Sequence, residues 1–199
     1  MVFDYETCGL NLGSLSNKPW QLAFLLCEGK KILSRHNYWL YWDDIEVSPE
    51  AARITGWTKS KYKKLAVDPE KPLELFEKYL YDKEYMSVGH NLLGFDVYIH
   101  NINRHLLNKG SDFSYANRLV DTNCIAKGIK MGINLDKDDE LLSWQYRMIG
   151  VRQRGVKTNL KQLCVDYDID FDPSKLHDAL YDIEKNFEVF QKLIWAFEV

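Results

Sequence analysis

Residues 2–10 read Val-Phe-Asp-Tyr-Glu-Thr-Cys-Gly-Leu, an apolar and aromatic stretch that carries two carboxylates and runs into a glycine. Its apolar character predicts a buried strand followed by a loop. Side chains two residues apart lie on the same face of a strand, so Asp4 and Glu6 could share a cation. A carboxylate in an apolar strand is costly to bury unless it is paired or bound to a metal. About four acidic pairs at this spacing would arise by chance in such a chain, so the pair indicates a cation site only together with its apolar context.

Beyond this strand the pattern changes from β to alternating α/β. Residues 20–27 and 32–42 are rich in β-favouring side chains and are separated by a turn, which predicts three consecutive strands in an antiparallel meander. The last helix is expected to begin near Ala179 and to run through Phe197, because apolar residues recur there at steps of three and four. The stretch 128–158 has no decisive pattern. Other short helices and strands are expected in the segments 49–55, 72–80, 86–88, 95–110, 119–120 and 159–167, and Asp121 or Thr122 could cap a helix that follows residue 120.

Length and composition limit the class of protein. With 199 residues, 46% of them apolar, the chain can bury one core, and we expect a single domain over residues 1–199. A net charge of −3 gives no polybasic signature, so any basic contact surface must be local. The four cysteines are widely separated, which fits reduced thiols. Neither a leader nor an apolar run of membrane length is visible, so we expect a soluble cytoplasmic protein with no membrane partner.

A second carboxylate pattern lies in Gly-His-Asn-Leu-Leu-Gly-Phe-Asp, residues 89–96. An apolar strand ends at Gly89, and the turn that follows delivers Asp96 to the start of the next helix. An aspartate at a helix start is often only an N-cap, which accepts hydrogen bonds from free backbone N–H groups. From the residues alone, a capping role and a functional role for Asp96 are equally supported.

A third pattern, Leu-His-Asp-Ala-Leu-Tyr-Asp, occupies residues 176–182 before the last amphipathic stretch. On one continuous helix His177 and Asp182 would be about 140° apart and would not share a face. His177 must therefore come from the approach to the helix. This arrangement suits Asp182 as a ligand on a rigid element and His177 as the group that moves a proton.

These three patterns, FDYETCGL, GHNLLGFD and HDALYD, resemble the motifs of the DEDDh 3′→5′ exonucleases, which include the proofreading subunit of bacterial DNA polymerase III and RNase T. SPEAARITGW, LVDTNCIAK and NLKQLCVDYDI are similar to further segments of these enzymes in the same order. The resemblance thus covers nearly the whole chain. It implies an α/β, ribonuclease-H-like fold, in which a mixed sheet of about five strands is flanked by helices.

The resemblance also implies a two-metal-ion mechanism. Asp4, Glu6, Asp96 and Asp182 would hold two Mg²⁺ or Mn²⁺ ions, and an all-oxygen ligand set independently suits such hard cations. His177 would be the general base that deprotonates the attacking water. Asp178, one helical turn from Asp182, is a competing ligand, and the family spacing from His177 favours Asp182.

The implied substrate is the 3′ end of single-stranded nucleic acid, with release of nucleoside 5′-monophosphates. DNA is the first expectation and exoribonuclease action on RNA or short oligonucleotides is the alternative, because recognition of the 2′-OH depends on pocket shape. The first motif begins within four residues of Met1, which favours a standalone bacterial or bacteriophage enzyme in the bacterial or host cytoplasm. Residues expected to contact substrate are Thr7, Cys8, Gly9, Leu10, His90, Asn91 and Phe95.

Several alternatives remain open at this point. Cys8 stands where many relatives have threonine, which leaves the contact with the terminal base open, and His90 and Asn91 could be ordinary turn residues. A nucleic-acid-binding module without catalysis is a second class, although such a module has no physical reason to keep a costly anionic cluster. The basic run 58–64 could form a solvated face or contact phosphates. The same choice applies to the group Arg152, Arg154 and Lys157.

Overall fold

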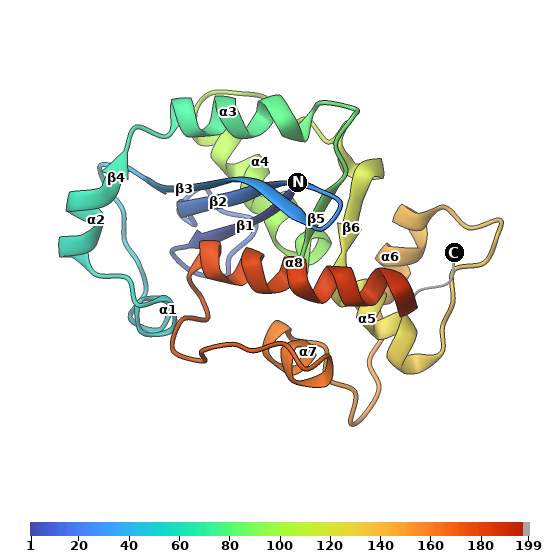
Figure 1. Cartoon of the computed structure of the whole chain (residues 1–199). Coiled ribbons are helices and arrows are strands. Elements are labelled where there is room, and N and C mark those ends of the chain that lie inside the picture. The colour runs from blue at the N-terminus through green and yellow to red at the C-terminus, as the bar shows by residue number, and fades with distance from the viewer. Residues whose placement is uncertain (197–199) are drawn as a thin grey trace.

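The computed structural model describes residues 1–196, which form a six-stranded mixed sheet with helices on both faces (Figure 1). The strand order is β4-β3-β2-β1-β5-β6. The first three strands pair antiparallel, as the predicted meander requires, and the other pairings are parallel. The strands are β1 (Val2–Thr7), β2 (Pro19–Glu28), β3 (Lys31–Leu40), β4 (Ala66–Val67), β5 (Ser87–Gly89) and β6 (Leu119–Asp121).

The expected fold class is therefore present, with one strand more than expected. The additional strand is β4, whose two residues pair with the end of β3. A strand of two residues is too short to produce an alternating pattern, so sequence periodicity could not predict it.

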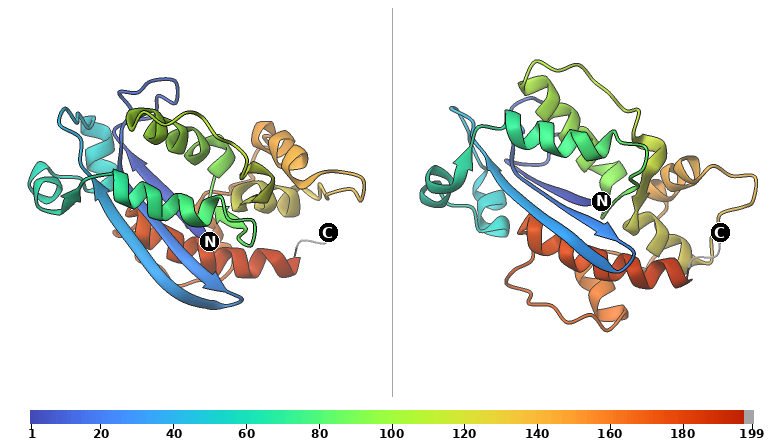
Figure 2. Two further views of the ribbon diagram at one scale, coloured as in Figure 1. Left: turned by 90° about the horizontal axis from the view of Figure 1, so that it is seen from above. Right: turned by 45° about the horizontal axis from the view of Figure 1, so that its top comes forward.

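Helices cover the two faces of the sheet unequally (Figures 1 and 2). Helices α3 and α4 lie on one face and the long helix α8 lies on the other, with α7 outside α8 and α5 and α6 near its carboxyl end. The α-helices are α1 (Pro49–Thr55), α2 (Lys59–Leu65), α3 (Glu70–Leu80), α4 (Asp96–Leu106), α5 (Thr122–Met131), α6 (Leu141–Gly150), α7 (Leu160–Asp166) and α8 (Ala179–Ala196), and short 3₁₀ turns cover η1 (Leu92–Gly94) and η2 (Ala116–Arg118).

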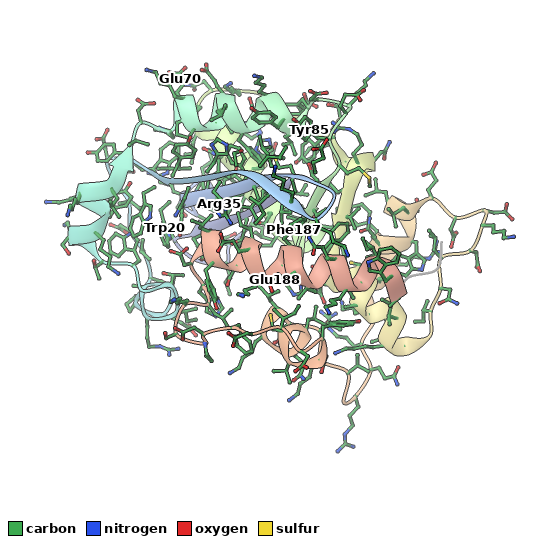
Figure 3. The ribbon with its side chains drawn as sticks, viewed as in Figure 1. Trp20, Arg35, Glu70, Tyr85, Phe187 and Glu188 are labelled. Carbon is green, nitrogen blue, oxygen red and sulfur yellow. The ribbon has the colours of Figure 1, made fainter. Side chains whose placement is uncertain are left out.

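The alternation of β1 divides the core into two layers. Phe3 and Tyr5 pack on the α3–α4 side, where Phe76 lies 5.0 Å from the Phe3 ring centre. Val2 packs on the opposite side with α8, to which Phe187 contributes. Figure 3 labels Phe187 on α8 and Arg35 on the sheet. Asp4 and Glu6 share the face of Val2, so β1 carries both carboxylates on the side of α8.

The close approach of β5 to β1 depends on a glycine. A Cβ atom on Gly89 would lie 2.9 Å from the carbonyl oxygen of Phe3 and 2.3 Å from the Leu92 side chain. Only glycine lets the backbone that follows β5 pass so near to β1. The strand that leads into the second motif therefore sits directly beside the strand that carries the first.

Helix α6 lies inside the stretch 128–158, for which the sequence pattern predicted no element. Phe197, the last residue of the predicted final helix, lies outside the described residues. Within residues 1–196, no helix combines the length and the apolar character that crossing a membrane requires.

Candidate active site

The first pair of carboxylates lies where β1 changes its register. Glu6 pairs with Gln21 but Thr7 pairs with Pro19, so a β-bulge falls between the two residues. The indole N–H of Trp20 donates to the carbonyl oxygen of Thr7 at 3.1 Å and fixes the bulge. Bulges of this kind redirect side chains at the end of a strand and are common beside active sites.

Asp96 is held against β1 by its side chain. It is 1% exposed, and its Oδ1 accepts a hydrogen bond of 2.9 Å from the backbone N–H of Tyr5, the residue between Asp4 and Glu6. Helix α4 begins at Asp96 itself, and the preceding residue makes no side-chain cap. Asp96 therefore does not stand at the N-cap position of α4, and its carboxylate bonds to the strand that carries the first motif.

The two aspartates of the third motif occupy different environments. Asp178 caps α8, since its Oδ1 accepts from the backbone N–H groups of Leu180 at 3.1 Å and Tyr181 at 3.2 Å. Asp182 accepts the backbone N–H of His177 at Oδ2, at 3.0 Å, while its Oδ1 is buried without a hydrogen-bond partner in the described structure. The oxygen that lacks a partner belongs to Asp182.

His177 precedes α8, as the spacing of the motif predicted. Its backbone has φ 70°, a left-handed conformation that costs energy for a residue with a side chain and often marks a functional position. The residue is exposed as a whole, and partial burial of its imidazole lowers its pKa below the ordinary value of 6.5. At pH 7 the ring is neutral and can accept a proton.

Ligand atoms of Glu6, His177 and Asp182 all lie within 4.8 Å of one another. Asp4 is outside this tightest group but belongs to the same electrostatic cluster: burial raises its pKa well above 3.8, and Asp96, Glu6 and Asp182 raise it further. The structure thus gathers β1, α4 and α8 at one point.

The pKa values of the other carboxyl groups show how costly this gathering is. Burial raises the pKa of Glu6 and of Asp96, and neighbouring carboxylates add to both effects. Burial, followed by the charge of Asp178, raises the pKa of Asp182 to about 7. Like charges that meet without a cation disfavour their own ionised forms.

This donor set fits divalent cations. The four carboxylates supply oxygen ligands of the kind that Mg²⁺ and Mn²⁺ prefer, and the buried Oδ1 of Asp182 has a free coordination position. A bound cation would also offset the mutual repulsion of the carboxylates. The residues present are therefore suitable for the metal ions that the sequence implied.

A cleft of about 450 Å³ opens on this cluster. Asp4, His177 and Asp182 line it together with His90 and Asn91 of the second motif. Two of the expected substrate contacts thus face the same cleft as three of the expected catalytic residues. Phe95, the third expected contact from the second motif, is half-buried at the start of α4 and is not among the residues that line the cleft.

The other expected contacts form the loop after β1. Thr7 closes it by donating its hydroxyl to the carbonyl oxygen of Gly9 at 2.6 Å, and the N–H of Gly9 donates to Asn17 at 2.9 Å. Cys8 is buried, whereas Leu10 is 86% exposed and free to pack on a ligand. Cys8, Gly9 and Leu10 line a separate depression of about 380 Å³, which begins two residues beyond Glu6 along the chain.

Sequence reasoning missed the residue that shapes the second motif. Asp121 was expected only as a possible helix cap, and it does cap α5 by accepting from the N–H of Asn123 at 3.0 Å. Its carboxylate also accepts from the N–H groups of Asn91 at 2.9 Å and Leu93 at 3.1 Å. Its position at the end of the buried strand β6 was a usable signal, because parallel strands bring their carboxyl ends to one edge.

Comparison with known proteins supports the fold. No protein-family model matches the chain, and no curated protein matches it by sequence. A zinc-bound structure of E. coli exonuclease I with single-stranded DNA superposes with a TM-score of 0.73 at 16% identity, over 96% of this chain and 39% of that chain. Exonuclease I from Methylocaldum szegediense gives a TM-score of 0.70 at 18% identity, over 97% of this chain and 39% of that chain.

A third solved structure, a product-bound exonuclease I, gives a TM-score of 0.72 at 18% identity, over 97% of this chain and 42% of that chain. This chain therefore spans about two fifths of the length of the exonuclease I structures that it matches. At these identities the likeness concerns the fold. The ribonuclease-H-like fold expected from the sequence is confirmed.

Proposed function

We propose that this chain is a metal-dependent 3′→5′ exonuclease domain, spanning residues 1–199, that releases nucleoside 5′-monophosphates from single-stranded DNA. The observation that carries the proposal is the cluster of carboxylates around His177. Asp4, His177 and Asp182 line one cleft, and ligand atoms of Glu6 lie within 4.8 Å of those of His177 and Asp182. Asp96 bonds to the backbone between Asp4 and Glu6, and within residues 1–196 the buried Oδ1 of Asp182 has no hydrogen-bond partner. Buried anionic clusters are costly and are retained where they bind cations or take part in chemistry.

In this proposal each residue of the site has a defined task. Asp4, Glu6, Asp96 and Asp182 hold two Mg²⁺ or Mn²⁺ ions. When bound, such ions activate water, hold the scissile phosphate and stabilise the leaving 3′ oxygen. A ring nitrogen of His177, neutral at pH 7, accepts the proton of the attacking water. The hydrogen bond from the backbone N–H of His177 to the Asp182 carboxylate holds the general base beside the metal ligand.

The loop after β1 supplies the contact with the terminal nucleotide. Leu10 packs on the terminal base, and the backbone around Cys8 and Gly9 approaches the sugar, in the depression beside the carboxylates. His90 and Asn91 lie along the cleft on the other side of the cluster. DNA is favoured over RNA because similar folds have been solved with single-stranded DNA bound.

The proposal is tested by incubating the protein with single strands of DNA and of RNA of the same sequence, in Mg²⁺, in Mn²⁺ and in EDTA. We expect loss of the DNA strand with either metal ion and none in EDTA. Faster loss of the RNA strand would show that the substrate class is wrong while the nuclease activity stands. Cleavage in EDTA, or no cleavage under any condition, would reject the proposal.

A further inference from the structure

A second groove continues from the active-site cleft and is not used by the chemistry above. It has a volume of about 460 Å³ and shares His90, Asn91 and Asn159 with the cleft. It runs from these residues towards the connection between α6 and α7, where Arg152 lies. A ligand that occupies the cleft can therefore extend into this groove without leaving the protein surface.

The composition of the groove suits a nucleotide. Two cationic side chains, Lys127 and Arg152, line it, and no acidic residue of the described chain does. Amide side chains, which both donate and accept hydrogen bonds as base edges do, line it together with aliphatic side chains that include Ile149 and Val156. The amide-bearing residues that line it are Asn91, Asn123, Gln153 and Asn159.

Lys127 is a buried cation that forms no ion pair within residues 1–196. It is 7% exposed, and its ammonium donates to the carbonyl oxygens of Met148 and Ile149, both at 3.1 Å. An ammonium has three donors, so one remains after these two bonds. Burial, followed by the nearby charge of Arg152, lowers the pKa of Lys127, and the charge of Asp121 acts in the opposite direction to a smaller extent.

Arg152 adds a second cation at the rim of the groove. It is exposed, and one of its terminal nitrogens donates to the carbonyl oxygens of Ile149 at 2.7 Å and Val151 at 3.2 Å. These bonds fix the guanidinium while leaving its other donors available. Neither Arg152 nor Lys127 forms an ion pair within residues 1–196. Two cations on one groove without a carboxylate favour an anionic ligand.

The position of the groove relative to β1 indicates which nucleotide of a single-stranded nucleic acid it would bind. The depression formed by Cys8, Gly9 and Leu10 lies at the end of β1 on the side of β2. The groove lies on the opposite side, next to β5 and β6, because His90 follows β5 and Asn123 follows β6. The carboxylates of β1 stand between the two. A single-stranded nucleic acid that crosses the carboxylates would place its terminal nucleotide in the depression and the preceding nucleotide in the groove.

We propose that this groove binds the nucleotide that precedes the scissile bond, with Lys127 and Arg152 contacting the phosphate on its 5′ side. The proposal rests on the exonuclease function proposed above. The amide side chains contact the edges of that base, and the aliphatic residues pack on its face. Because this phosphate is remote from the reacting atoms, the contact strengthens binding and leaves the chemical step unchanged.

A chemical double-mutant cycle tests the contact. Removing the charge of the second phosphate from the 3′ end, by a methylphosphonate at that linkage, should raise the KM of the wild-type protein about tenfold with little change in kcat. Arg152→Gln should raise KM by a smaller factor for the unmodified strand, because Lys127 still contacts the same phosphate, and the methylphosphonate should then raise KM by less than tenfold. Lys127→Gln should behave in the same way, since the amide can still donate to a carbonyl at the end of α6. In the double variant the methylphosphonate should have little further effect.

Matched controls separate a local contact from a general charge effect. A methylphosphonate at the fourth linkage, and the variant Arg147→Gln, should change KM less than twofold; Arg147 lies on α6, pairs with Asp139 and does not line the groove. Melting temperatures of all variants show whether they fold. Additive effects of Arg152→Gln and the second-linkage methylphosphonate would overturn the proposed contact.

A binding measurement keeps the two proposals distinguishable. Fluorescence polarisation with labelled oligonucleotides in EDTA repeats the same cycle without turnover. If the protein cuts DNA but neither KM nor binding shows coupling, the groove proposal fails and the exonuclease proposal stands. If the protein binds with coupling but never cuts, the groove proposal stands and the exonuclease proposal fails.

Discussion

At the scale of single residues, the third motif shows how two aspartates four positions apart acquire different roles. The Oδ1 of Asp178 accepts from free N–H groups at the start of α8, whereas Asp182 has a buried oxygen with no hydrogen-bond partner among residues 1–196. The sequence favoured Asp182 only through the family spacing. Hydrogen bonding now favours the same residue, because a capping carboxylate is already satisfied.

This difference predicts unequal losses on substitution. Asp182→Asn should reduce exonuclease activity by at least a thousandfold, on the order expected when a metal ligand is lost. Asp178→Asn should keep most of the activity and lower the free energy of unfolding by about 1 kcal/mol or less, since asparagine is also a good N-cap. Initial rates and urea unfolding of both variants measure these effects. A larger loss of activity in Asp178→Asn than in Asp182→Asn would reverse the assignment.

The role of His177 is tested by its effect on turnover. If His177 is the general base, His177→Ala should lower kcat by roughly 10² to 10⁴ with a small change in KM. The variant should still bind metal ions, which is measured as the change in its melting temperature on addition of Mg²⁺. An unchanged kcat would remove His177 from this role.

A buried histidine outside the site makes stability depend on pH. His100 is 1% exposed and lies between the hydroxyls of Tyr5 at 3.2 Å and Tyr81 at 3.3 Å; burial, followed by the charge of Arg104, lowers its pKa to about 3. Above pH 6.5 neither the native nor the unfolded chain protonates this residue. Below pH 6.5 only the unfolded chain takes up the proton, so the contribution of His100 to stability decreases as the pH falls.

We therefore expect the difference in unfolding free energy between wild type and His100→Gln to shrink by about 2 kcal/mol between pH 7 and pH 5. The carboxylates of the candidate site titrate in both proteins and largely cancel in this difference. Urea titrations at several pH values in EDTA provide the measurement. A constant difference over this range would show that native His100 is not held neutral.

Among the helices and strands, sequence periodicity was sufficient to predict those that are long and buried on one side. The meander and α8 were predicted for this reason, and the approach of His177 to α8 followed from helical geometry alone. Helix α2 was interpreted only as a basic run, because Tyr62 is its one buried residue. Its lysines are exposed, as a solvated face requires.

The junction of β1 and β5 gives a prediction at this scale. Gly89→Ala should lower the free energy of unfolding by about 1–3 kcal/mol, because the new methyl group would meet the backbone of Phe3 as well as Leu92. Gly110→Ala is the matched control, since no atom outside its immediate neighbours lies within 4 Å of a Cβ there. Chemical denaturation compares the two. Equal stabilities would show that β1 and β5 can separate without cost.

At the scale of the whole molecule, the sheet order brings distant motifs together. β1 lies between β2 and β5, so the first motif stands beside the turn of the second, and α8 crosses the same face with the third. Local patterns could not predict this meeting; the resemblance to a known family did. Neither source predicted the groove beside His90 and Asn91, because it forms between α5, the connection after α6 and the end of β5.

Removal of nucleotides one at a time from a 3′ end is the activity proposed for these residues. The decisive experiment follows a single-stranded DNA of non-repeating sequence by mass spectrometry at short times in Mg²⁺. We predict nucleoside 5′-monophosphates, released in the order of the sequence read from the 3′ end, and strands shortened only at that end. Release of nucleoside 3′-monophosphates, shortening from the 5′ end, or internal fragments as first products would contradict the account.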